Sequence, residues 1–153
     1  MKPTFNENYK GIRCRVYLVR ENPSSEIISI SDSSAAYELV KEELVNSDRE
    51  RFLSIMLTIK NHLIGVETVS IGSNHACVIR PMDVLKGPML ANAFGCILAH
   101  NHPSGVLSPS DNDIELTKHL IEAGELLGIK ILDHLIISNQ GYSSLRGYCN
   151  FPH

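Results

Sequence analysis

The sequence contains no apolar run that approaches the roughly 20 residues that a membrane-spanning helix needs. Residues 1–15 also lack the apolar core of a signal peptide, so we expect a cytoplasmic protein without membrane association. Positive charge is not in excess, because 14 Lys and Arg residues stand against 17 Asp and Glu residues, for a net charge of −3. This balance argues against a general nucleic-acid-binding protein, which should present a basic face.

Closely spaced cysteines are missing as well. Cys14, Cys77, Cys96 and Cys149 form no CxxC pair, which disfavours a structural zinc site built from cysteines. We expect all four to be buried or half-buried free thiols in a reducing compartment.

The composition is that of a soluble globular protein, with 43% apolar and 20% charged residues. A chain of 153 residues is long enough for one domain with a substantial core. We therefore expect a single domain over residues 1–153, in which the polar residues 1–10 are flexible.

Strands and helices alternate in the second half of the chain, after a strand-rich middle, which predicts a mixed sheet with helices packed on it. Helices are expected at residues 31–45, 80–93 and 110–128. Strands are expected at residues 12–21, 26–30, 94–99, 129–138 and 141–145, and as a hairpin over residues 49–73 that turns at Lys60 and Asn61. The segment FGCILA at residues 94–99 is continuously apolar, as in a central strand buried on both faces.

Two histidines directly follow that apolar strand. If the extended conformation continues, His100 and His102 point to the same side of the chain and Asn101 points away. Both imidazoles can then reach one point in space, as a metal ion requires of two ligands about 2.0–2.1 Å away. The loop at residues 103–109 bends the chain and brings the start of the next helix back towards the strand end.

Asp113, in the first turn of that helix, is the candidate third ligand. Two histidines and one carboxylate with an open fourth position form a catalytic zinc arrangement. A structural interpretation is also available, because Ser110 and Asp113 fit a capping arrangement at the positive end of the helix dipole.

The complete spacing is that of a known family. His100, His102, Ser110 and Asp113 follow the order His-x-His, seven residues, Ser, two residues, Asp, and the run IELTKHLIEAGELLGIKILDHLIIS comes next. Over roughly residues 45–148 the chain resembles the RadC family of JAB/MPN proteins, which carry this JAMM motif. The resemblance implies a three-layer α/β/α sandwich with a mixed sheet, similar to cytidine deaminases. It also implies a metallopeptidase that uses Zn²⁺ to cut a peptide or isopeptide bond.

The resemblance assigns His100, His102 and Asp113 as zinc ligands and requires an upstream Glu that activates water. Our candidate is Glu67, in the segment LIGVETVSIG, which shares its phase with Val69 on the apolar face of a strand. A carboxylate on such a face is costly unless it has a partner or a function. Glu67 would take the proton of the attacking water and deliver it to the leaving amine.

Ser110 and His134 each have two interpretations. In JAMM proteases the serine hydrogen-bonds the tetrahedral oxyanion, and we expect this role for Ser110 unless its hydroxyl is committed to the helix cap. His134 is a candidate partner of a metal ligand, although a structural histidine is the simpler interpretation.

Other features of the sequence bear on three further functions. A DNA-repair-associated accessory or a non-catalytic interaction module fits the label that RadC-like proteins carry. Residues 1–50 are, however, too short for the helix-hairpin-helix segment of longer members. Two histidines and a carboxylate also form the non-haem Fe(II) site of oxygenases, but those sites usually lie in all-β barrels. Base deamination is disfavoured because His-x-Glu and Pro-Cys-x-x-Cys are absent. The partner that the resemblance implies is a peptide or protein substrate.

Overall fold

The protein is described by a computed structural model that covers residues 14–72 and 78–153. Its strands are β1 (Arg51–Leu57), β2 (Leu63–Ile71), β3 (Gly95–Asn101), β4 (Lys130–Ser138) and β5 (Gly141–Ser144). Its helices are α1 (Ser33–Val45), α2 (Pro81–Leu90) and α3 (Asp111–Leu127), with a 3-10 turn at Leu145–Gly147. The strands form one mixed sheet in the order β2-β1-β3-β4-β5, in which only β3 and β4 run parallel.

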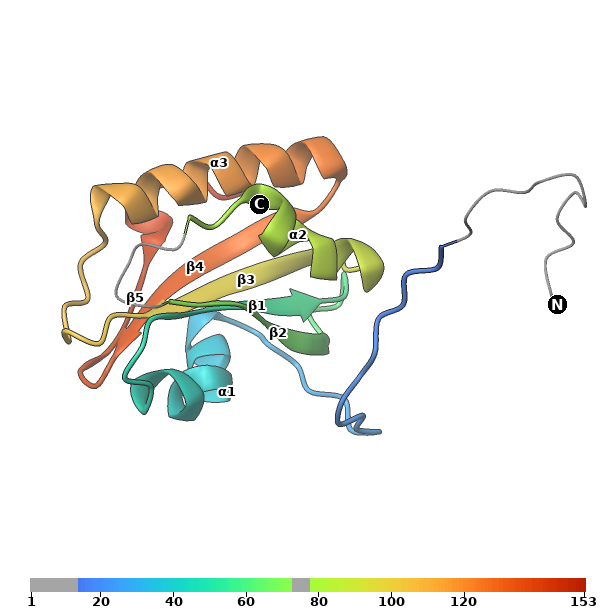
Figure 1. Ribbon diagram of the computed structural model, residues 1–153, viewed down its shortest axis with the longest axis horizontal. Helices are drawn as coiled ribbons and strands as arrows, with labels where there is room; N and C mark the ends of the chain where they lie inside the picture. The colour runs from blue at the N-terminus through green and yellow to red at the C-terminus, as the bar shows by residue number, and fades with distance from the viewer. Residues whose placement is uncertain (1–13, 73–77) are drawn as a thin grey trace, which may run out of the picture.

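The helices lie on both faces of the sheet, with α1 on one side and α2 and α3 on the other (Figure 1). Each face has its own apolar core. Leu53 and Ile97 belong to the core under α1, whereas Phe52 and Leu98 belong to the core under α3. The predicted three-layer α/β/α sandwich with a mixed sheet is therefore confirmed.

The central strand is β3, all of whose residues are buried, as the apolar run at residues 94–99 predicted. The hairpin is confirmed too, since β1 and β2 pair antiparallel and Asn61 takes a left-handed φ of 58° at the turn. The predicted helices and the strands at residues 129–138 and 141–145 also form, with small shifts at their ends.

The first two predicted strands do not form as expected. The prediction for residues 12–21 is wrong over residues 14–20, which have no regular secondary structure and are exposed. Residues 26–30 contribute only an isolated bridge between Ser29 and His62. An alternating pattern makes a strand only where another strand supplies hydrogen bonds, and residues 14–20 extend away from the sheet (Figure 1).

The cysteine prediction holds in part. Cys96 and Cys149 are buried free thiols, and burial raises the pKa of Cys96 to about 12. Cys14 is exposed, contrary to the prediction, because its segment packs on no other element. The predictions for Cys77 and for flexibility of residues 1–10 lie outside the described residues. Over the part of the chain that the structure describes, none of the helices has the length and apolar character needed to cross a membrane.

The contact between α3 and the start of β4 gives a stability prediction. Gly124 accepts a hydrogen bond from the backbone N–H of Ile129 (2.8 Å), and a Cβ at Gly124 would lie 2.4 Å from the carbonyl oxygen of Ile129. We expect Gly124→Ala to lower the free energy of unfolding by about 1–3 kcal/mol, because backbone on both sides must shift. Urea unfolding measures this loss. Gly147→Ala, where nothing lies within 4 Å of the new Cβ, is the control, and an equal loss in both variants would contradict the prediction.

Candidate metal centre

The end of β3 presents the two histidines to one side of the sheet. His100 is the penultimate residue of the strand and is only 2% exposed, and His102 follows just beyond the strand. Asn101 points away, where its side chain accepts a hydrogen bond from the backbone N–H of Arg51 (2.7 Å) and donates one to the carbonyl of Arg49 (2.9 Å). The alternation expected from the sequence therefore places both imidazoles together.

A tight turn after β3 orients the His102 ring. Gly105 adopts φ = +86°, a left-handed conformation that favours glycine, and its N–H donates to the carbonyl of His102 (3.0 Å). This turn places the carbonyl oxygen of Val106 2.8 Å from Nδ1 of His102. Because a carbonyl oxygen only accepts, Nδ1 carries the proton and Nε2 of neutral His102 keeps a free lone pair.

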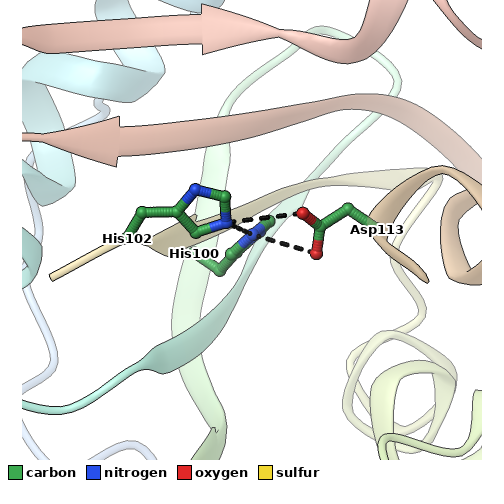
Figure 2. Close-up of side chains that lie close together, drawn as sticks. All are labelled: His100, His102 and Asp113. Carbon is green, nitrogen blue, oxygen red and sulfur yellow. Dashed lines mark hydrogen bonds and ion pairs between the residues drawn. The ribbon is translucent and has the colours of Figure 1, made fainter. Parts of the chain in front are cut away.

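The start of α3 supplies the carboxylate. Ser110 is the N-cap: its Oγ accepts from the Asp113 N–H (3.1 Å), and the Asp113 carboxylate accepts from the Ser110 N–H (2.8 Å). This capping box aims the Asp113 oxygens at the histidines (Figure 2). They lie 3.3 Å from Nε2 of His100 and 3.4 Å from Nε2 of His102.

The three side chains form one compact donor cluster. One ligand atom from each of His100, His102 and Asp113 lies within 4.8 Å of the others. Burial alone would raise the pKa of Asp113, but the close interactions with the two histidines outweigh it and hold that pKa well below its usual value. The interaction with Asp113 in turn raises the pKa of His102. Donor atoms of this kind and number suit a divalent metal ion.

A third histidine lies behind the cluster. His134, fully buried on β4, has Nε2 2.8 Å from Nδ1 of His100 and Nδ1 2.6 Å from Oγ1 of Thr117. Burial lowers the pKa of His134 well below its usual value, and the neighbouring His100 acts in the same direction. The sequence offered His134 as a candidate partner of a metal ligand but favoured a structural histidine. The structure places its ring directly against His100.

The cluster opens into a pocket of about 840 Å³. Apolar lining comes from Phe52, Val78, Ile79, Val106 and Leu116, and polar lining from Glu50, Ser70, Ser104, Ser108, Ser110 and Asn112. His102 and Asp113 reach the pocket wall, whereas His100 lies beneath it. Among the described residues of the cluster, His102 and Asp113 are therefore the two that a ligand in the pocket would contact.

The same region of the chain matches a known family. The family model described as "RadC-like JAB domain" matches residues 30–149, most of the chain. The chain belongs to the RadC-like JAB domain family. This membership agrees with the resemblance that the His-x-His, Ser and Asp spacing indicated.

Curated relatives of this RadC-like JAB domain come from bacteria and an archaeon. A UPF0758 protein of Caldanaerobacter subterraneus subsp. tengcongensis is 42% identical over 128 residues, which are 82% of this chain and 55% of the relative. The UPF0758 protein of Desulforamulus reducens is 47% identical over 108 residues, which are 71% of this chain and 48% of the relative. The UPF0758 protein of Methanosarcina acetivorans is 41% identical over 126 residues, which are 82% of this chain and 54% of the relative. The chain spans about half the length of these relatives, and their names state no activity.

Glu67, the acid expected from the sequence, is not brought to this cluster. It pairs with Ser54 on β1, whereas the strand partner of His100 is Phe52, which pairs with Ser70. Its carboxylate lies under α2, where a Cβ at Gly87 would come 1.8 Å from Oε2. Burial raises the pKa of Glu67, and Oε2 is a buried oxygen without a hydrogen-bond partner among the described residues. Among the described residues, Glu67 therefore faces α2 of this RadC-like JAB domain and is not one of those that line the pocket; its role as the acid that activates water stays a prediction.

Glu50 is the acidic residue that the sequence reasoning missed. It lines the pocket together with His102 and Asp113, and its charge contributes to the raised pKa of His102 after the larger effect of Asp113. The N–H of Gly72 donates to its carbonyl (2.7 Å), and Asn101 holds the residues on either side of it. The signal available in the sequence was its position directly before β1, at the edge where β3 ends.

Proposed function

We propose that this RadC-like JAB domain is a zinc-dependent hydrolase of the JAMM metallopeptidase type that cleaves a peptide or isopeptide bond. The observation that carries the proposal is the set of separations among the donor atoms. The two Nε2 atoms of His100 and His102 lie 3.0 Å apart, and the carboxylate oxygens of Asp113 lie 3.3 and 3.4 Å from them. Ligands on a tetrahedral zinc ion with bonds near 2.0–2.1 Å are separated by about 3.3 Å.

The donor chemistry fits zinc as well. Two imidazole nitrogens and one carboxylate oxygen, with one position left open, are the protein ligands of several catalytic zinc sites. His102 already presents a free Nε2 lone pair because its Nδ1–H is donated to Val106. When bound there, zinc would supply Lewis acidity that makes water a nucleophile near neutral pH.

The residues of the pocket have distinct roles in this proposal. In this proposal Glu50 accepts the proton of the attacking water and returns it to the leaving amine, the role that the sequence predicted for Glu67. Ser110 donates a hydrogen bond to the oxygen of the substrate carbonyl as negative charge develops there. The cap and this role are compatible, because the cap uses a lone pair of Oγ and leaves the hydroxyl proton free.

The proposal is tested with fluorogenic peptide and isopeptide substrates. We expect cleavage by the zinc-loaded protein, loss of cleavage after chelation and recovery when zinc is added back. Because the same donors also bind Fe(II), an iron-loaded sample is compared in the presence of oxygen. Oxygen-dependent products from the iron form, with no cleavage by the zinc form, would overturn the proposal.

A further inference from the structure

The buried histidine behind the cluster carries an inference that rests on the proposed metal site and goes beyond it. Within the described part of the chain, His134 hydrogen-bonds to the cluster through His100, and it is neither among the residues that line the pocket nor a member of the donor group. Nδ1 of His134 lies 2.6 Å from Oγ1 of Thr117 on α3, a residue that is also fully buried. The chain of contacts therefore runs from α3 through β4 to β3 without access to water.

The directions of these hydrogen bonds follow from the far end of the chain of contacts. Oγ1 of Thr117 lies 2.6 Å from the backbone carbonyl oxygen of Asp113. Two oxygens at this distance need a proton between them, and the carbonyl has none, so the hydroxyl donates its single proton there. Thr117 can then only accept from His134. His134 consequently carries its proton on Nδ1 and offers Nε2 as an acceptor.

The same assignment of protons fixes the tautomer of His100. Because Nε2 of His134 accepts, the proton in the 2.8 Å contact belongs to Nδ1 of His100. Neutral His100 then has a free lone pair on Nε2, the nitrogen that faces His102 and Asp113. In these neutral tautomers the Nε2 lone pairs of the two histidines and the Asp113 carboxylate face one another, an arrangement that a divalent cation satisfies.

We propose that His134 and Thr117 are positioning residues that fix the tautomer and ring orientation of His100, so that its Nε2 lone pair is held towards the metal. Phe52 restrains both rings: it stacks on His100 at 5.9 Å between centroids and meets His134 edge-on at 5.2 Å. The outer partner of a metal-bound histidine is ordinarily a carboxylate, carbonyl or water. Here it is a neutral imidazole, itself oriented by a helix hydroxyl.

Zinc affinity, measured by competition with a chromophoric chelator, tests the proposal. His134→Phe keeps a ring of similar size and removes the acceptor, so we expect the affinity to fall about 10- to 100-fold, the range for lost outer partners. Thr117→Val lets His134 adopt the other tautomer, and a fall in the same direction is expected. His134→Gln supplies an amide oxygen as acceptor and should recover most of the affinity. His119→Phe, at an exposed position of α3, is the matched control and should bind zinc as the wild type does.

Nitrogen-15 NMR of the metal-free wild type at about pH 8, above the usual histidine pKa, gives a readout that packing alone does not move. We expect the proton on Nδ1 in both His100 and His134. A proton on Nε2 of either ring, or wild-type zinc affinity in a folded His134→Phe or Thr117→Val variant, would overturn the proposal. If His134→Phe does not fold, Thr117→Val and the wild-type tautomers decide. Zinc binding without hydrolysis would count against the proposed enzyme alone, whereas no zinc binding by the wild type would count against both proposals.

Discussion

Replacing His102 with alanine is expected to reduce bound zinc from about one ion per chain to background after dialysis. The change removes one of three protein ligands, and the remaining pair, His100 and Asp113, cannot define a tetrahedral site. His102 lies beyond the end of β3 with part of its side chain at the pocket wall, so the core should remain intact. Elemental analysis of the purified protein measures the result, and circular dichroism checks the fold.

His102→Ala is a cleaner test than a change at Asp113. The Asp113 carboxylate also accepts the Ser110 N–H, so Asp113→Ala would remove a ligand and weaken the helix start together. His119→Ala, on the exposed side of α3, serves as the control and should keep its zinc. Zinc retained at the wild-type level by His102→Ala would mean that the ion binds elsewhere on the protein.

Glu50→Gln is expected to lower kcat about 10²- to 10⁴-fold while zinc content stays near one ion per chain, because it removes a general base and preserves the shape of the side chain. The structural reason is the place of Glu50 on the pocket wall with His102 and Asp113. Kinetics on a substrate identified with the zinc-loaded protein, together with metal analysis, measure both effects.

Glu67→Gln is the matched control for this prediction. It makes the same chemical change at a carboxylate that lies under α2, against Gly87, and should leave kcat near that of the wild type. The opposite pattern, with a large loss in Glu67→Gln and none in Glu50→Gln, would return the general-base role to the residue that the sequence suggested.

The donor cluster of His100, His102 and Asp113 could be predicted because its residues are close in sequence and their geometry is local. His100 and His102 share a side by strand alternation, and Ser110 and Asp113 are related by one helical turn. A single loop joins the two pairs. Each of these relations follows from the backbone periods of strands and helices, without knowledge of the rest of the fold.

The acidic residues near the site depend on relations between strands. The sequence phase predicts correctly that Glu67 and Val69 share the inner, half-buried face of β2. The pairing shifts between Phe52 and Leu53, however, so that Ser70 rather than Val69 lies opposite Phe52, the strand partner of His100. Such a bulge has no clear signature in one sequence. Choosing Glu50 also required knowing that β1 lies beside β3 in the sheet, a non-local fact.

The unformed strand at residues 14–20 has a related cause. Its alternating, β-branched sequence describes a preference of the chain, whereas a strand needs a neighbour with free backbone groups. Residues 26–30 find such a neighbour only at one point, opposite His62. The sequence shows the β-propensity of this segment, but it does not show which strand would pair with it.

The capping box at the start of α3 has a consequence for protein engineering. Asp113 is both the last residue of the capping box and a donor of the cluster. The rotation of the helix about its axis therefore also sets the direction of the carboxylate. Inserting or deleting a single residue between Ser110 and Asp113 would turn the carboxylate by about 100° around the helix axis. A graft of this centre onto another scaffold must therefore transfer the strand end and the first helical turn as one rigid unit, and the loop between them must keep the Gly105 turn and the Val106 carbonyl that orient His102.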